Sequence, residues 1–322
     1  MALLSRIYFN AVFGALGGLL GWLLYGAFGD KKPETKGLQD IQMLVGGALI
    51  GGLIGYFVVS VEAIRDASLA RFARLGTYGF VLAAIGGAPG MLLGDYINEG
   101  VQASFGVNLF SLMLARGLGW TVLGITIGMS EGIAARSLGK FSYGMIGGAL
   151  GGFVGGSLFA LVYEPGGGSL SYWSGAIGLM ILGACIGSLS ALVKAVFQPA
   201  SVKVMRGWQE GREYPLDKAA SLLGRDEHAD IALFRDMKVE KRHAFIKRVG
   251  ERYLLVNNNA PPEQTRVNDA PVGQTQELTD GDRIQLGNVI LRFQARAAIN
   301  RARGKRPGPT PVALPSSAIR KM

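Results

Sequence analysis

The sequence predicts an α-helical transmembrane bundle of about six helices, arranged as three two-helix repeats, followed by an all-β sandwich. Hydrophobic residues make up 49% of its 322 residues and charged residues only 17%, which is too apolar for a chain that is soluble throughout. Residues 1–197 hold 11 Lys and Arg and 9 Asp and Glu, whereas residues 198–322 hold 22 and 14. We therefore predict a glycine-rich transmembrane domain at residues 1–197, a sandwich domain at residues 201–296 and a basic disordered tail at residues 297–322.

Six apolar runs are long enough to cross a hydrocarbon core, which needs roughly 20 helical residues. They are Ile7–Phe28, Met43–Val61, Leu75–Gly94, Gly117–Ala134, Tyr143–Tyr163 and Ser174–Val193. The first run has no small-x-small cleavage pattern at its end, so we interpret it as a span and not as a signal peptide. Arg116 interrupts the apolar stretch that contains the fourth run, and its side chain is expected near a membrane interface.

Glycine accounts for 49 residues, and many of those in the apolar runs are spaced by four, which places them on one face of a helix. Such faces let a neighbouring backbone approach closely in lipid. Sliding the sequence by 69 places Gly55, Glu62 and Gly79 on Gly124, Glu131 and Gly148, and sliding it by 134 places Gly14 on Gly148. Chance matches are common among glycines, but the acidic match favours three parallel copies of one helical hairpin.

The connections between the spans predict the orientation of the bundle. One side is basic, with Arg6, Arg65, Arg71, Arg74, Arg136, Lys140 and Lys194, and the opposite loops include Asp95, Glu99 and Glu164. The positive-inside rule then places both termini in the cytoplasm.

Glu62 and Glu131 occupy matching positions near the inner ends of their helices. An ionisable residue within a span is often functional, so these carboxylates, together with Arg116, are candidates for a proton or cation path. The alternative is that both carboxylates are neutralised by nearby basic residues such as Arg65 and Arg136. No run of polar residues continues across the bilayer, which favours this second interpretation.

The sequence shows no sign of catalysis. It contains no nucleophile elbow, P-loop, kinase signature or metal-binding cluster, and its only histidines are His228 and His243. The single cysteine, Cys185, lies in an apolar run and is interpreted as a core residue. We therefore expect no enzymatic activity, no cofactor and no metal.

From about Ser201 the pattern changes to short alternating runs, including Tyr253–Val256 and Val289–Phe293, at about ten-residue spacing. Such runs predict an antiparallel sandwich. Tight turns at Asp280–Asp282 and Leu286–Asn288 predict that the last strands form a hairpin.

Four motifs stand in order within this region. They are SLLGRDEHADIALF (221–234), KVEKRHAFI (238–246), TRVN (265–268) and LTDGDRIQLGNVILRF (278–293). In this order and spacing, residues 202–296 resemble the forkhead-associated (FHA) domain. The coupling of such a domain to a glycine-rich multi-span region is also similar to a group of bacterial membrane proteins, which implies the inner (cell) membrane of a bacterium.

The resemblance implies an eleven-stranded sandwich that binds phosphothreonine peptides through loops at one end. A phosphate carries roughly −1.5 to −2 charge, so its recognition needs cationic and hydroxyl or amide donors. Arg225 matches the phosphate-contacting arginine of the family, and Lys241 or Arg242 could add a second positive charge. Thr265 and Asn268 anchor the later loop and complete the expected site. Gly224 and His243 match positions that are structural in the family.

Several positions depart from the FHA pattern. The phosphate-binding serine falls on Glu240, and the later loop has Pro261, Glu263 and Gln264 where the family has serine, asparagine and glycine. An asparagine cluster, Asn257–Asn259, could compensate if that loop is shifted. Both phosphothreonine binding and phosphate-independent docking are therefore consistent with the sequence.

The last 26 residues, from Ala297, contain six basic residues, no acidic residue and four prolines, a composition that cannot bury a core. Such a tail can lie against anionic lipid or simply be solvated, and nucleic-acid binding is not expected. The preferred interpretation of the whole chain is a membrane-anchored cytoplasmic docking or signalling adaptor. A channel or transporter regulated by the FHA-like domain is the alternative, and a scaffold that forms homo-oligomers through glycine faces is a third hypothesis.

Overall fold

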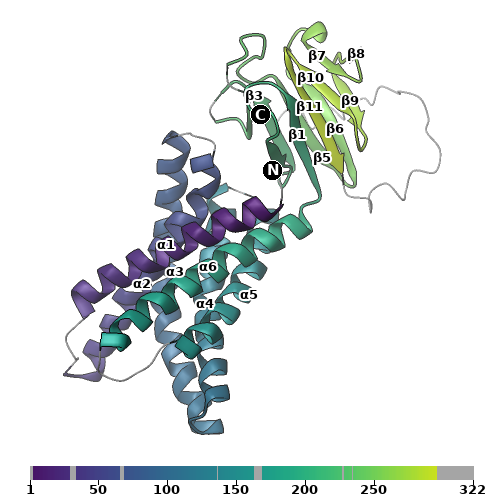
Figure 1. Ribbon diagram of the computed structural model, residues 1–322. Helices are drawn as coiled ribbons and strands as arrows, with labels where there is room; N and C mark the ends of the chain where they lie inside the picture. The colour runs from purple at the N-terminus through teal and green to yellow at the C-terminus, as the bar shows by residue number, and fades with distance from the viewer. Residues whose placement is uncertain are drawn as a thin grey trace. The chain divides into compact units, whose positions relative to one another are not determined.

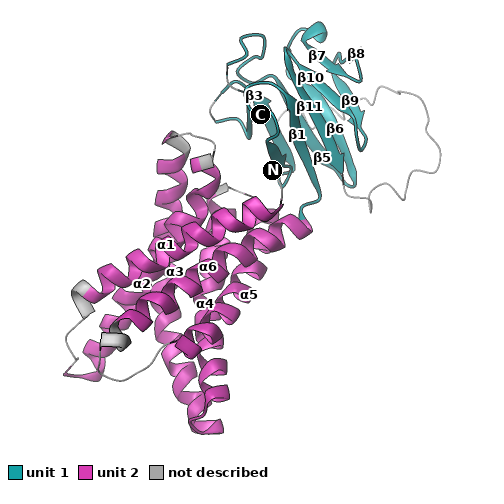
Figure 2. Ribbon diagram, in the orientation of Figure 1, with its two compact units in different colours: residues 1, 198–322 teal, residues 2–197 magenta. Residues whose placement is uncertain are grey.

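The computed structural model describes residues 3–29, 34–65, 69–135, 137–162, 169–226, 228–233 and 235–295. The predicted tail at residues 297–322, Arg136 and Glu164 lie outside the described residues, as do the side chains of Arg65 and Arg71. The chain divides into two compact units, residues 2–197 and residues 198–322 together with residue 1 (Figure 2). Each unit is described by itself.

The first unit consists of six long apolar helices (Figure 1). They are α1 (Leu3–Gly29), α2 (Lys36–Arg65), α3 (Leu69–Phe105), α4 (Leu109–Ala135), α5 (Leu138–Val162) and α6 (Ser169–Phe197). All six are long and apolar enough to cross a membrane, which confirms the predicted number of spans. Helix α3 has 37 residues and continues well past the predicted end at Gly94. At about 1.5 Å per residue it exceeds a hydrocarbon core of about 30 Å.

The six helices form a closed ring. Each helix packs against the next one in the chain, and α6 packs against α1. Glycines make the closest contacts: a Cβ added to Gly124 would overlap the carbonyl of Gly148, and one added to Gly14 would overlap that of Gly183. A Cβ added to Gly55 would lie 2.7 Å from the carbonyl oxygen of Gly79. In the predicted repeat alignment, the α2–α3 contact of Gly55 with Gly79 corresponds to the α4–α5 contact of Gly124 with Gly148.

Large aliphatic side chains fill the centre of the ring. Ile54, Leu123, Ile127, Leu182 and Ile186 are completely buried and belong to one apolar cluster. They come from α2, α4 and α6, which alternate around the ring, so their side chains meet at its middle. Aliphatic side chains of the protein therefore fill the middle of the bundle where these residues lie.

The second unit is a sandwich of eleven strands in two sheets, as predicted. One sheet has the order β2-β1-β11-β10-β7-β8 and the other β4-β3-β5-β6-β9. The strands are β1 (Ala200–Arg206), β2 (Glu213–Pro215), β3 (Ala220–Gly224), β4 (Ile231–Ala232), β5 (Ala244–Val249), β6 (Arg252–Asn257), β7 (Thr265–Val267), β8 (Ala270–Pro271), β9 (Thr275–Leu278), β10 (Arg283–Leu286) and β11 (Val289–Ala295). The predicted hairpin is formed by β10 and β11 and turns at Gly287, whose φ of +57° suits glycine.

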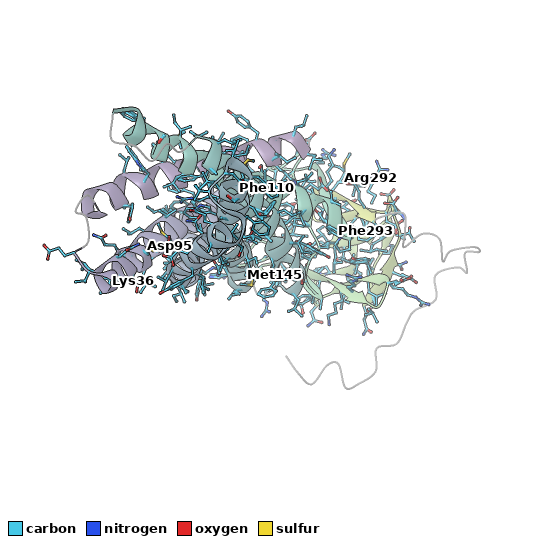
Figure 3. The ribbon with its side chains drawn as sticks, turned by 90° about the horizontal axis from the view of Figure 1, so that it is seen from below. Lys36, Asp95, Phe110, Met145, Arg292 and Phe293 are labelled. Carbon is cyan, nitrogen blue, oxygen red and sulfur yellow. The ribbon has the colours of Figure 1, made fainter. Side chains whose placement is uncertain are left out.

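Buried positions alternate with more exposed ones along β10 and β11. Arg292 and Phe293 of β11, both labelled in Figure 3, illustrate it: Arg292 is exposed and Phe293 is completely buried. The ring of Phe293 lies 5.2 Å from that of Tyr253 in the opposite sheet. Burial of such aromatic side chains is the main stabilising term of a water-exposed sandwich.

Strand register defines two ends of the sandwich. At one end the chain enters at Ala200, which pairs with Ala295. At the other end, which we call the loop end, lie Gly224, Thr265 and Leu286 and the connections β1–β2, β3–β4, β4–β5, β6–β7, β8–β9 and β10–β11. Strand β1 runs over seven residues from the entry end to the loop end, roughly 20 Å at about 3.3 Å per residue.

Candidate functional site

Gly224 and Arg225 stand where β3 meets the loop end. A Cβ at Gly224 would overlap the carbonyl of Lys241, so only glycine lets the β4–β5 connection cross here. Beyond it, the amide of Arg225 donates to the carbonyl of Glu240 at 2.9 Å and that of Asp226 to the carbonyl of Lys241 at 3.1 Å. The structure therefore brings Arg225 together with Glu240, Lys241 and the adjacent Arg242.

His243 and Thr265 tie two of these loops together. His243 is completely buried, and its Nδ1 accepts a hydrogen bond from the amide of Glu240 at 3.1 Å. Its Nε2 therefore carries the proton and donates to Oγ1 of Thr265 at 2.9 Å. Burial lowers the pKa of His243, which favours this neutral form. Thr265 is also completely buried, so its hydroxyl organises the loops and does not face a ligand.

Asn268 is not brought to the loop end. It lies after β7 with φ +49°, donates to Asp282 Oδ1 at 2.9 Å and accepts from the amide of Arg283 at 3.0 Å. Because Thr265 pairs with Leu286 and β7 then runs toward the entry end, Asn268 sits at the opposite end of the sandwich from Arg225. The difference arises because a motif fixes residue order, whereas strand direction decides which end each residue occupies.

The asparagine cluster holds the β6–β7 connection. The side-chain amide of Asn257 donates to the carbonyl of Ala260 at 2.8 Å, and that of Asn258 donates to the carbonyl of Arg242 at 2.7 Å. Asn259 is exposed and has φ +61°. Two of the three side chains are therefore used to position the loops.

The exposed side chains around Arg225 carry both signs of charge. Lys241 and Arg242 are exposed, and so are Glu240 and Glu263, which stand where the FHA pattern has serine and asparagine. Nη1 of Arg225 lies 2.7 Å from the sulfur of Met237, a weak acceptor. Met237 is not among the site residues expected from the sequence. The only feature of the sequence that could have indicated it is an apolar residue between charged ones in a loop. Both signs of charge are therefore exposed at the loop end.

The intramembrane carboxylates pair with lysines. The Glu131 side chain is 8% exposed, forms an ion pair with Lys194 and lies 3.7 Å from Lys140. Nζ of Lys140 also lies 2.8 Å from Oε2 of Glu62. Helices α5 and α2 are not neighbours in the ring, so the Lys140 to Glu62 pair crosses it. Charge pairing within the bundle supports the structural interpretation of both carboxylates.

Arg116 lies apart from these carboxylates. Its guanidinium is 5.5 Å from the ring centre of Phe159, which in turn lies 5.9 Å from the ring of Trp120. A half-buried arginine over an aromatic ring is held by cation–π attraction and by packing of its aliphatic stem. The structure therefore does not bring Arg116 together with Glu62 or Glu131.

Part of the chain is similar to known proteins. Residues 203–297 match the protein family described as the inner membrane component of T3SS, cytoplasmic domain. Similar solved structures include an FHA domain from a structural and functional analysis of phosphothreonine-dependent FHA domain interactions, with 33% identity and a TM-score of 0.28 over 30% of this chain and 97% of that one. A comparison with curated proteins found no match to this chain.

Two further structures illustrate the same likeness. The FhaA FHA domain, solved in complex with the intracellular domain of Rv3910, is 34% identical over 30% of this chain and 99% of that one, with a TM-score of 0.27. The FHA domain of the CT664 protein from Chlamydia trachomatis is 24% identical over 31% of this chain and 99% of that one, with a TM-score of 0.28. The motif order and the eleven-stranded topology of this chain confirm the predicted FHA-type domain.

Proposed function

We propose that this chain is a bacterial inner-membrane protein whose FHA-type domain docks a partner protein in the cytoplasm, with both chain termini on that side. In this proposal residues 1–197 anchor the chain in the bilayer, residues 201–296 bind the partner and the chain has no catalytic role. The match of residues 203–297 to a cytoplasmic domain of an inner-membrane component supports it.

We further propose that docking does not require phosphothreonine. The observation that carries this step is the pair of exposed carboxylates, Glu240 and Glu263, at positions where the FHA pattern supplies phosphate and peptide donors. Two negative charges at the same end of the domain as Arg225 reduce the attraction of this end for a phosphate that carries roughly −1.5 to −2 charge. The organising pair His243 and Thr265 is nevertheless intact, so the loops are held in shape.

The test is affinity capture with the full chain in lipid nanodiscs, before and after phosphatase treatment of the cytoplasmic extract. The same partner should be retained from both extracts. His243→Ala should abolish capture because it removes the link between two loops, whereas Arg252→Ala, which changes an exposed residue at the entry end of the same domain, should not. Loss of the partner after phosphatase treatment would establish phosphothreonine reading instead.

An anchor role for the bundle is supported over a channel by its filled centre and its paired carboxylates. Purified chain in liposomes should therefore give no proton or cation flux above protein-free liposomes. Flux that disappears in a Glu62→Gln or Glu131→Gln variant would favour the transport alternative.

The structure also bears on assembly through glycine faces. The faces that the scaffold hypothesis assigns to a second copy are used within the monomer, since Gly148 meets Gly124 and Gly14 meets Gly183. We therefore propose that these faces close the ring of one chain.

A further inference from the structure

An apolar and basic patch lies at the loop end and shares the half-buried Arg225 with the site described above. We call it the Trp208 patch and define it as Trp208, Arg225, Arg235 and Met237. Trp208 is 58% exposed and Met237 is 78% exposed, which is unusual for side chains of this size and hydrophobicity. The guanidinium of Arg235 lies 3.5 Å from the ring centre of Trp208, and that of Arg225 contacts Met237.

The patch lies on loops that are held in place by hydrogen bonds. Asp236, between Arg235 and Met237, accepts hydrogen bonds from the amide of Asn288 at 2.6 Å and from that of Lys238 at 3.1 Å. Its Oδ1 also accepts from the side-chain amide of Asn288 at 3.2 Å. The β4–β5 connection is thereby held to the β10–β11 turn. Side chains presented on a held loop lose less conformational entropy when a partner binds.

Composition points to a protein partner. Trp, Arg and Met are enriched at protein interfaces, and residues that dominate binding energy are most often Trp, Tyr and Arg. A guanidinium stacked on an indole face presents a flat surface that offers both apolar area and hydrogen-bond donors. This combination suits a partner that brings apolar and hydrogen-bonding groups together.

Charge defines the chemistry of that partner. Arg225, Arg235 and Lys238 make the patch and its border positive, while Asp236 directs its carboxylate to amides. An anionic bilayer would also be attracted to basic residues, but the exposed carboxylates of Glu240 and Glu263 at the same end of the domain oppose it. A discrete acidic segment can pair with the arginines and avoid these carboxylates.

We propose that the Trp208 patch binds an acidic segment of a partner protein, with apolar side chains covering Trp208 and Met237 and carboxylates pairing with Arg225 and Arg235. The proposal rests on the docking function above and identifies the chemical class of the partner. It differs from phosphate recognition in that the main contact is an indole and a thioether, and the negative groups are carboxylates.

The experiment selects a phage-displayed library of random twelve-residue peptides on the full chain in nanodiscs of zwitterionic lipid. Enriched peptides should combine Asp or Glu with aromatic or aliphatic residues. Binding of a synthetic enriched peptide should weaken at least tenfold in Trp208→Ala and in Arg235→Glu. The matched controls, Val249→Ala and Arg252→Glu, change exposed residues at the opposite end of the domain and should leave its affinity unchanged.

Each other outcome rejects a stated part of the proposal. Enriched peptides that lack acidic residues, or that bind Trp208→Ala as well as the unchanged chain, would overturn the patch while leaving docking intact. Selection of no peptide at all would contradict the docking function itself. Tethering of phosphatidylserine vesicles by the unchanged chain, lost in Trp208→Ala, would assign the patch to a lipid surface and overturn the protein partner.

Discussion

The two units of this molecule are held together in opposite ways. Helices of the bundle meet where side chains are missing, as at Gly128, where an added Cβ would overlap the carbonyl of Gly144. The sheets of the sandwich meet through the largest side chains available, such as Tyr253 and Phe293. Lipid is as apolar as a leucine side chain, so burying apolar side chains stabilises a bundle little in a bilayer, and van der Waals contact between closely approaching backbones stabilises it instead. In water, the hydrophobic effect drives large apolar side chains together.

The units also differ in how they use charge. In the bundle, Lys194 and Glu131 are largely buried. In the sandwich, Lys218 and Asp230 form an ion pair of 2.7 Å in which both side chains are about a third exposed. Desolvation makes the loss of one partner more serious in the first case than in the second. Substitutions at a close glycine contact, in the sandwich core and at a buried and a solvated ion pair can therefore test the contrast between the two units.

The largest effect is expected for Gly128→Leu. Its side chain has no space beside Gly144, and overpacking of a close contact typically costs about 1–3 kcal/mol or more for even small additions. The variant should fail to give a stable, monodisperse bundle in detergent. Gly26→Leu is the matched control, because a Cβ there meets no atom within 4 Å, and it should behave as the unchanged chain. Equal stability of both variants would mean that α4 and α5 are not closely packed.

Phe293→Ala should unfold the sandwich selectively. Removal of a completely buried phenylalanine costs roughly 3–5 kcal/mol, a large fraction of the stability of a small domain. Limited proteolysis in nanodiscs should then digest the sandwich while the bundle stays protected. Arg292→Ala, at the adjacent exposed position, should change the proteolysis rate little. Simultaneous loss of both units would show that they do not fold independently.

Lys194→Met should lower the unfolding temperature of the bundle in detergent. It leaves the Glu131 carboxylate largely buried with Lys140 3.7 Å away, and the expected loss is about 3 kcal/mol. Lys218→Met in the sandwich should cost at most about 1 kcal/mol. The double variant Glu131→Leu with Lys194→Met should recover stability, since it removes both charges. Failure of the double variant to recover would place the effect in packing and not in charge.

The smallest effect concerns His243. Burial lowers its pKa in the folded domain below the value of about 6.5 expected in the unfolded chain. The unfolded state therefore binds more protons below about pH 6.5, so stability is full above that pH and falls as the pH is lowered. The slope should not exceed about 1.4 kcal/mol per pH unit. Thermal melts of residues 198–295 between pH 5.5 and 7.5 should show this slope, and a flat stability across that range would contradict it.

The sequence predicted the elements well where one physical pattern dominates. Long apolar runs are unfavourable when exposed to water, so hydropathy predicted the six spans. The four FHA-type motifs predicted where the sandwich lies. The length of α3 could not be predicted from hydropathy, because a helix continues through polar residues such as Asp95, labelled in Figure 3, as long as its backbone stays hydrogen-bonded. Helix ends are set by local backbone bonding and not by the bilayer.

Site residues were harder to predict because they depend on three-dimensional neighbours. Gly224 lies against the carbonyl of Lys241 and His243 contacts Thr265, neighbours that residue order alone does not identify. Glu62 and Glu131 pair with Lys140 and Lys194 across the ring, a match that sequence proximity to Arg65 or Arg136 did not suggest. Trp208 and Arg235 lie 27 positions apart in the chain, and only the folded loops stack them.

The contact between α1 and α6 determines when the bundle can be completed. Helix α1 keeps an unoccupied glycine face at Gly14 until Gly183 has been synthesised. Glu62 likewise has no lysine at 2.8 Å until Lys140, 78 residues later, has entered the membrane. Early intermediates during insertion therefore expose small-residue surfaces and a carboxylate until α5 and α6 have entered the membrane.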